Sequence, residues 1–289
     1  MDMPSRIEKA SWGLEEGAEI AEGRSVVEDL GGGRRYEVYL VWDERLYSLA
    51  VAKVLRPDRV ERDGSVRALR REAELLERLA HPVVVRGFDA VLEGDYPHVL
   101  IEYLDGVMLR RLISRHGRLP LEQLLPLAQQ ILSALHYLST EGVVHLDVKP
   151  GNIVMGVPPR LIDLSLARTV EGAAQLQKAV GTWSYMAPEQ CDPLSHPGKV
   201  GLPADVFGLG ATLHHAISGE FPFARAADAA ASNDLRVRCP QLVEEPVPLP
   251  KDVPPLLQDL IAQMLARDPG QRPSPSEAAD ALEPLAAHT

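Results

Sequence analysis

Eight residues, His145 to Asn152, constrain this chain more than any other segment. They read His-Leu-Asp-Val-Lys-Pro-Gly-Asn and are followed directly by the apolar run Ile153–Met155, a pattern typical of a loop that enters a short strand. A second carboxylate, Asp163, follows eleven residues after Asn152. We therefore expect two neighbouring strand-and-loop elements, each carrying a polar side chain with an oxygen atom.

The residue types in these elements suit one kind of chemistry. An amide and a carboxylate held side by side can share a hard cation such as Mg²⁺, which prefers oxygen ligands, so Asn152 and Asp163 are the candidate metal ligands. Asp147 stands where an acceptor hydroxyl gives up its proton, and Lys149 where a phosphate in transfer needs positive charge. The loop therefore indicates phosphoryl transfer. The simpler alternative is a polar turn with His145 as an ordinary core histidine.

The loop closely resembles the catalytic loop of eukaryotic-type protein kinases, H-R-D-x-K-x-x-N. Segments that resemble the family's glycine-rich loop, V-A-I-K strand, D-F-G, A-P-E and conserved arginine follow in order over about residues 25 to 287. They are Gly31-Gly32-Gly33 ahead of Val38, Ala50-Val51-Ala52-Lys53, Asp163-Leu164-Ser165, Ala187-Pro188-Glu189 and Arg272. In the family this arginine pairs with the glutamate of A-P-E, and Asp205 resembles the buried aspartate that holds the catalytic loop. The chain thus resembles bacterial eukaryotic-like (Hanks-type) serine/threonine kinases, with H-L-D for H-R-D and D-L-S for D-F-G.

The order of hydrophobic patterns agrees with this resemblance. Strand-like alternation fills most of residues 25–103, interrupted by a charged amphipathic helix over 62–79, and helical periodicity dominates residues 104–289. Strands followed by helices indicate an α+β fold. The resemblance implies one two-lobed kinase domain, with five antiparallel strands and one helix in the small N-lobe and a larger helical C-lobe. Residues 1–24 are expected to form an extension packed on the domain.

The resemblance also implies where ATP and its metal bind. Lys53, held by Glu72 on the helix, would orient the α- and β-phosphates. The glycine turn would let backbone N–H groups approach the polyphosphate, although by itself it is more typical of a plain hairpin. The backbone of Glu102 and Leu104 would meet the adenine edge. The expected nucleotide-binding residues are Gly31, Gly33, Val38, Ala52, Lys53, Glu72, Glu102 and Leu104, with Mg²⁺, or Mn²⁺ in its place, as the metal.

Three departures from the family pattern bear on activity and regulation. Tyr36 stands at the third glycine of the loop, Leu146 replaces the arginine that ordinarily receives an activation-segment phosphate, and Ser165 replaces the D-F-G glycine. Residues 170–181 also contain no serine, threonine or tyrosine. We therefore predict an enzyme that needs no activation-loop phosphorylation. Its D-L-S segment should flip outward less readily than one with glycine.

Composition limits the partners. A net charge of −11 argues against nucleic acid, because phosphate backbones repel an acidic surface. No apolar run approaches the roughly 18 residues of a membrane span, the start is not that of a signal peptide, and the chain has only two cysteines. We expect a cytoplasmic protein with protein substrates, no membrane partner and no length left for a sensor domain. Substrate identity, the activating signal and oligomeric state stay open.

Three other functions remain open besides that of an active kinase. A pseudokinase that serves as a regulatory or scaffold module would keep the fold without catalysis, and the three departures favour it. A small-molecule phosphotransferase of related fold would carry H-G-D, and Lys149, Glu189 and Arg272 speak against it. A purely structural interaction protein is the least specific alternative. All phosphate- and metal-handling side chains are retained, and Lys149 two residues after Asp147 favours serine or threonine over tyrosine as acceptor.

Overall fold

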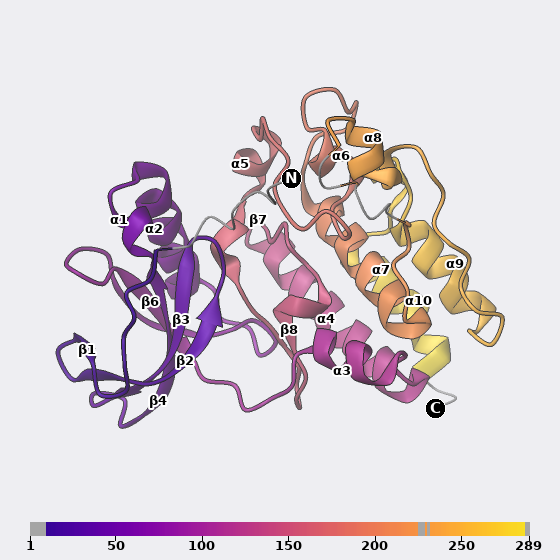
Figure 1. Cartoon of the computed structure of the whole chain (residues 1–289). Coiled ribbons are helices and arrows are strands. Elements are labelled where there is room, and N and C mark those ends of the chain that lie inside the picture. Colours follow the sequence, from indigo (N-terminus) through magenta and orange to yellow (C-terminus); the bar gives the residue numbers. More distant parts are fainter. Residues whose placement is uncertain (1–9, 225–228, 230–231, 287–289) are drawn as a thin grey trace, which may run out of the picture. The chain divides into compact units, whose positions relative to one another are not determined.

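The computed structural model describes residues 10–224, 229 and 232–286 (Figure 1). These residues form two compact units. The first comprises the described residues up to 80 together with 85–105, and the second comprises 81–84 and the described residues from 106 onwards. Strands dominate the first unit and helices the second. The α+β, two-lobed fold class predicted from the sequence is therefore confirmed.

A six-stranded antiparallel sheet forms the first unit, in the order β1-β2-β3-β4-β6-β5. Its strands are β1 (Glu19–Ala21), β2 (Arg24–Gly32), β3 (Tyr36–Asp43), β4 (Ser48–Leu55), β5 (Gly87–Val91) and β6 (His98–Glu102). The expectation of five strands was wrong, because β1, within the expected extension, pairs with the start of β2. A one-turn helix, α1 (Pro57–Val60), also precedes the expected helix, α2 (Asp63–Arg78).

One face of this sheet carries the hydrophobic core of the first unit. Successive side chains of a strand point to opposite faces, so alternate residues of five strands meet in one cluster. The N-terminal segment packs there too, and Trp12 Nε1–H donates to the Leu55 carbonyl (2.7 Å). Residues 12–20 thus contribute side chains to the core of this unit. The buried members of the cluster are Ile20, Val26, Tyr39, Val41, Ala50, Ala52, Val54 and Leu100.

Helix α2 packs against β5 and β6. Its Leu69 and Leu76 are buried, as the helical spacing predicted. The approach to β5 is close because Gly87 lacks a side chain, and a Cβ there would stand 2.6 Å from the Cβ of Leu76. This contact fixes the position of α2, and with it the position of Glu72.

Two long helices, α4 (Leu121–Thr140) and α7 (Leu202–Ser218), form the centre of the second unit. Helix α4 packs against α7 and α10 (Pro275–Ala286), and α9 (Pro255–Met264) lies beside α7 and α10, in orange and yellow in Figure 1. Inside the described ranges, no helix combines the length and apolar character needed to cross a membrane. The other helices are α3 (Leu109–His116), α5 (Val170–Ala174), α6 (Pro188–Cys191) and α8 (Leu235–Arg238).

Two short antiparallel strand pairs position the loops of this unit. Strand β7 (Val143–Val144) pairs with β10 (Arg168–Thr169), and β8 (Ile153–Val154) pairs with β9 (Arg160–Leu161). Residues 145–152 lie between β7 and β8. The loop therefore begins at one strand pair and ends in the other. The short strand after Asn152 was predicted from the apolar run Ile153–Met155.

Candidate active site

The start of the catalytic loop, residues 145–152, is held by Asp205 of α7. The two carboxylate oxygens of Asp205 accept the backbone N–H groups of His145 (2.6 Å) and Leu146 (2.7 Å). Burial raises the pKa of Asp205, and the two backbone N–H donors oppose that rise. The role predicted for Asp205 beneath the loop is therefore confirmed.

His145 supports the loop from inside. Its ring is fully buried; Nδ1 accepts the Asp147 N–H (3.3 Å), and Nε2 lies 3.2 Å from the Ile162 carbonyl. These partners require a neutral imidazole with its proton on Nε2. His145 therefore holds the backbone at Asp147 and at Ile162, the residue before Asp163.

Asp147, Lys149 and Thr182 form a closed triangle of hydrogen bonds. Lys149 Nζ donates to Asp147 Oδ2 and to Thr182 Oγ1 (2.7 Å), while the Thr182 O–H donates to Asp147 Oδ1 (2.8 Å). The amide of Asn152 donates to the same carboxylate at Oδ2 (3.1 Å). Donors from the loop and from residue 182 thus fix the orientation of the carboxylate. Thr182 was not among the predicted site residues.

The hairpin of β8 and β9 brings the two candidate metal ligands to the same end. The Ile162 N–H donates to the Asn152 carbonyl (2.8 Å), so Asp163 follows directly beside Asn152. The Asn152 NH₂ group donates to the backbone carbonyl (2.9 Å) and carboxylate of Asp147, so the side-chain oxygen is the atom of the amide that could ligate a cation. An amide oxygen beside a carboxylate fits Mg²⁺.

Asp163 itself carries the unusual backbone of the D-L-S segment. It takes a left-handed φ of 69°, which aspartate tolerates because its side chain can bond locally, and Oδ1 accepts the Ser165 N–H (3.3 Å). Ser165 is buried and has no positive φ, so serine fits there without backbone strain. Among the described residues, no group of three or more His, Cys, Asp or Glu side chains could hold a metal. A cation here would therefore also need nucleotide or water oxygens.

In the first unit, Lys53 of β4 and Glu72 of α2 form the predicted ion pair, and both side chains are buried. The ring of Tyr36 covers this pair, with its centroid 5.1 Å from Lys53 Nζ, a cation–π arrangement. Tyr36 is buried, and its O–H has no hydrogen-bond partner within the described residues. Burial, followed by the Glu72 carboxylate, raises the pKa of Tyr36 to about 12. The phenol therefore stays neutral at physiological pH, and its ring lies over the Lys53 ammonium.

Strand alternation corrects one predicted nucleotide contact. Val38 faces Lys53 across β3 and β4, and Val51 lies two residues before Lys53, so these three residues share one face of the sheet. Ala52 points to the opposite face and is fully buried in the core cluster. The expectation that Ala52 meets the nucleotide was therefore wrong by one residue, and Val51 takes its place on the Lys53 face.

The turn between β2 and β3 needs glycine at two positions. Gly31 has a φ of 94°, which favours glycine. Gly32, which was not among the predicted site residues, has a φ of 149° and would place a Cβ 2.4 Å from the Tyr36 carbonyl oxygen. Gly33 closes the turn by donating its N–H to that same carbonyl (3.0 Å). The turn is thus a tight hairpin that brings the backbone close to Tyr36.

The predicted adenine-binding backbone lies at the end of β6, at Glu102 and Leu104. The Glu102 N–H donates to the Arg86 carbonyl (3.0 Å), and the Glu102 carboxylate accepts the Arg86 N–H (2.8 Å). Because its N–H is occupied, Glu102 could meet a base only through its carbonyl. Leu104 is partly buried two residues further on.

Leu146, at the position of the family's phosphate-binding arginine, is buried. It takes a left-handed φ of 68°, which costs roughly 1–2 kcal/mol for a residue with a Cβ. Its N–H is held by Asp205, and its carbonyl accepts Gln190 Nε2 (2.9 Å). The loop thus presents an apolar, inward side chain where a phosphate would need a cation.

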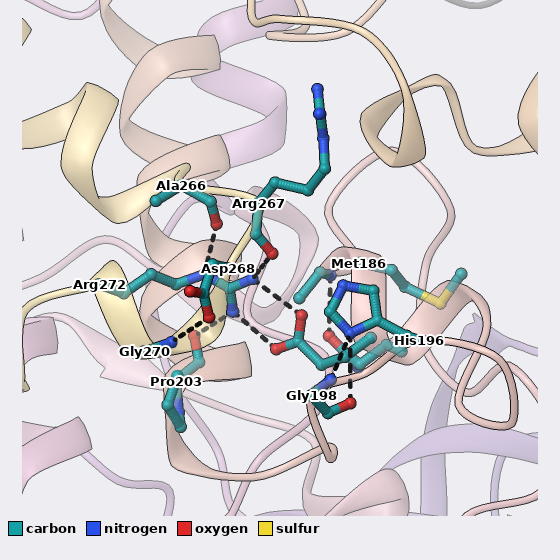
Figure 2. A network of polar contacts seen from close by, with 12 residues as sticks. Met186, His196, Gly198, Pro203, Ala266, Arg267, Asp268, Gly270 and Arg272 are labelled. Atoms are coloured by element: carbon teal, nitrogen blue, oxygen red, sulfur yellow. Dashed lines mark hydrogen bonds and ion pairs between the residues drawn. The ribbon is translucent and has the colours of Figure 1, made fainter.

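Glu189 and Arg272 form an ion pair with two hydrogen bonds, and both side chains are fully buried. Figure 2 shows the polar contacts around the Arg272 guanidinium. Nη1 donates to Oε1 (2.6 Å) and Nη2 to Oε2 (2.8 Å). The guanidinium also donates to the carbonyls of Ala266, Pro203 and Arg267. The pairing predicted from the sequence is confirmed, and its burial and full hydrogen bonding distinguish it from a weak surface pair.

Comparison with protein families matches residues 24–282 to the protein kinase domain. The chain is 31% identical over 258 residues to serine/threonine-protein kinase PknB of Mycolicibacterium smegmatis, covering 85% of this chain and 40% of that protein. It is 31% identical over 287 residues to serine/threonine-protein kinase pkn2 of Myxococcus xanthus, covering 93% and 33%. It is 33% identical over 246 residues to serine/threonine-protein kinase PknA of Mycobacterium tuberculosis, covering 82% and 54%. The chain thus spans between a third and about half the length of these relatives.

Proposed function

The chain belongs to the protein kinase domain family, and we propose that it is an active kinase that transfers the γ-phosphate of ATP to serine or threonine hydroxyls of protein substrates. The observation that carries this proposal is the triangle of Asp147, Lys149 and Thr182. It combines a fixed carboxylate, a compact cation and a hydroxyl that already donates to that carboxylate. These are the groups that phosphoryl transfer to an alcohol needs in one place.

In the proposed reaction, the acceptor hydroxyl donates its hydrogen to Asp147, which directs the oxygen toward the γ-phosphorus. A bond forms between this oxygen and phosphorus, the bond to the ADP oxygen breaks, and the proton passes to the carboxylate. Lys149 offsets negative charge on the moving phosphoryl group. In this structure the Thr182 hydroxyl donates to Asp147 Oδ1. During the reaction, Thr182 and the acceptor hydroxyl would both donate to the Asp147 carboxylate.

Asn152 and Asp163 are the residues that would hold Mg²⁺, whose charge, when bound, offsets that of the nucleotide phosphates. Lys53 would orient the α- and β-phosphates, and Glu72 keeps its ammonium in place. Val38 and Val51, on the Lys53 face, are the proposed apolar contacts of the base. The glycines at 31–33 would bring backbone N–H groups near the phosphates, and the Glu102 carbonyl and the Leu104 backbone would meet the adenine edge.

The second part of the proposal is that activity does not require a phosphorylated activation segment. Three observations support it. Leu146 is apolar and buried, residues 170–181 lack any hydroxyl, and the Thr182 hydroxyl is engaged with Asp147 and Lys149. The Thr169 hydroxyl caps helix α5 by accepting the Gly172 N–H (3.1 Å). If either threonine were phosphorylated, residue 146 would therefore provide no cation to bind the phosphate.

A nucleotide-binding pseudokinase is the second candidate, and the observation that favours it is the Tyr36 ring lying over Lys53. One experiment separates the two functions. Wild type and Asp147→Asn are incubated with radiolabelled ATP, Mg²⁺ and a serine/threonine peptide library, and ATP-induced thermal stabilisation is measured in parallel. We expect label on serine or threonine with wild type alone, and Mg²⁺-dependent stabilisation with both proteins. Stabilisation without transfer by wild type would establish the pseudokinase instead.

A further inference from the structure

Two buried glutamines hold residues 180–187, which we call the Thr182 segment. Gln190 belongs to α6, and Gln241 lies in a short 3-10 helix, Pro240–Leu242. Both side chains are 2% exposed. Buried amides are costly unless they are hydrogen-bonded, so the partners of each amide indicate what it stabilises.

Gln190 connects the Thr182 segment to the catalytic loop. Its Nε2 donates to the carbonyls of Leu146 and Val180 (2.9 Å each), and its Oε1 accepts the Ala187 N–H (3.1 Å). All hydrogens and one acceptor site of the amide are therefore used. One side chain thus ties both ends of the Thr182 segment to the residue that precedes Asp147.

The bond to Leu146 falls at a strained position. Leu146 has a φ of 68°, and this unfavourable conformation persists only where its surroundings fix it. Asp205 holds the N–H side and Gln190 holds the carbonyl side. Because this carbonyl belongs to the peptide bond of Asp147, Gln190 helps to set the orientation of the Asp147 backbone.

Gln241 provides a comparison within the same segment. Its Nε2 donates to the carbonyls of Trp183 (2.8 Å) and Met186 (2.9 Å). None of its hydrogen bonds within the described residues reaches the catalytic loop. Gln241 therefore anchors the Thr182 segment to the C-terminal half of the unit without linking it to Asp147.

We propose that Gln190 is a positioning residue, a neutral and permanent link that keeps Asp147 and Thr182 in the same relative positions. It would do so in place of a phosphate paired with an arginine at residue 146. This inference rests on the proposed kinase function and deepens it. A phosphatase cannot remove an uncharged amide link, so the arrangement of Asp147 and Thr182 would not depend on phosphorylation.

The test compares Gln190→Met with Gln241→Met. Each substitution keeps a side chain of similar length and leaves one buried and one partly buried carbonyl without its amide donor, so the two variants should lose comparable stability. We expect Gln190→Met to lower kcat by about 10- to 100-fold, as small displacements of catalytic groups do, with KM for ATP within about 2-fold of wild type. Gln241→Met should keep kcat within about 3-fold and raise KM for the peptide substrate.

A second variant guards against misfolding. Gln190→Glu keeps an acceptor for the Ala187 N–H but has no donor for the Leu146 and Val180 carbonyls, so it should lose kcat as Gln190→Met does. Mg²⁺-dependent ATP stabilisation identifies the folded proteins. Two outcomes with an active wild type would overturn this inference but leave the proposed kinase function standing. The first is an unchanged kcat in a folded Gln190 variant, and the second is an equal loss of kcat in the Gln190 and Gln241 variants. Unfolding of both Gln190 variants would also overturn it, because Gln190 would then serve folding only. No transfer by wild type would instead contradict the proposed function and this inference with it.

Discussion

The catalytic loop of the second unit and the Lys53 face of the first unit are stabilised in different ways. In the loop, the polar groups of His145, Asp147 and Lys149 have partners from α7, Ile162 and Thr182. On the Lys53 face, a tyrosine ring covers the ion pair, and its buried hydroxyl has no partner within the described residues. The difference teaches that hydrogen bonds already hold the catalytic loop in place, whereas on the Lys53 face an aromatic ring lies over the ammonium that we propose binds the nucleotide phosphates.

The largest expected effect concerns the catalytic loop. Lys149→Met removes the cation from the triangle and should lower kcat by about 10²- to 10³-fold, because charge stabilisation of the transition state is lost. The exposed Lys199 provides the control, and Lys199→Met should keep kcat within about 2-fold. Steady-state kinetics with a peptide substrate measure both. A Lys149 variant with more than about a tenth of wild-type kcat would mean that the triangle is not the reaction centre.

The next prediction concerns the buried pair below the Thr182 segment. Arg272→Met leaves Glu189 as an uncompensated buried charge and should lower the free energy of unfolding by about 3–5 kcal/mol. Arg118 pairs with Asp252 at 3.0 Å on the surface, so Arg118→Met should cost at most about 1 kcal/mol. Urea denaturation gives both values. Equal costs for the two variants would remove the distinction between a buried anchor and a surface pair.

The first unit has its own buried polar cluster, and this one predicts a pH dependence. Arg24 Nη1 donates to His98 Nε2 (2.6 Å), and His98 Nδ1 lies 2.6 Å from the Tyr96 carbonyl, so the imidazole is neutral. Burial lowers the pKa of His98 to about 4, against about 6.5 in an unfolded chain. Between those pH values the unfolded state binds a proton that the folded state does not. Stability should therefore fall by about 3 kcal/mol as pH drops from about 6.5 to about 4.

His98→Gln removes this titration, so its stability should depend less steeply on pH in that window. The exposed His116 provides the control, and His116→Gln should keep the wild-type slope. The measurement is the free energy of unfolding by urea at several pH values. Parallel curves for wild type and His98→Gln would contradict the assignment.

The smallest expected effect concerns the Lys53 face of the first unit. Tyr36→Gly removes the ring over Lys53, a cation–π contact worth about 1 kcal/mol, so KM for ATP should fall roughly 5-fold with little change in kcat. Tyr36→Phe keeps the ring and should keep the wild-type KM. An unchanged or raised KM for Tyr36→Gly would mean that the ring does not compete with the nucleotide.

Local patterns in the sequence predicted much of this molecule. The fold class, α2, and the loop at 145–152 follow from spacing within short segments. Pairs far apart in the chain, such as Lys53 with Glu72 and Glu189 with Arg272, were reached only through family resemblance, because no local pattern connects them.

The misses have physical causes. Ala52 was misplaced because a one-residue shift in matching a strand motif moves a side chain to the other face. Strand β1 was missed because three residues carry too little alternation to be recognised. Gln190 and Gln241 gave no signal, because glutamine is ordinarily exposed and here their main partners are backbone groups.

The central claim is that the catalytic loop is competent without a phosphate on the activation segment. The most direct measurement is the rate of γ-phosphate transfer to a serine/threonine peptide by wild type treated with phosphatase. Mass spectrometry should confirm that Thr169 and Thr182 are unmodified, with Asp147→Asn as the blank. We predict a rate within about 2-fold of that of the untreated enzyme and far above that of the Asp147→Asn blank. Loss of most activity on dephosphorylation, with recovery when either threonine is rephosphorylated, would contradict the account.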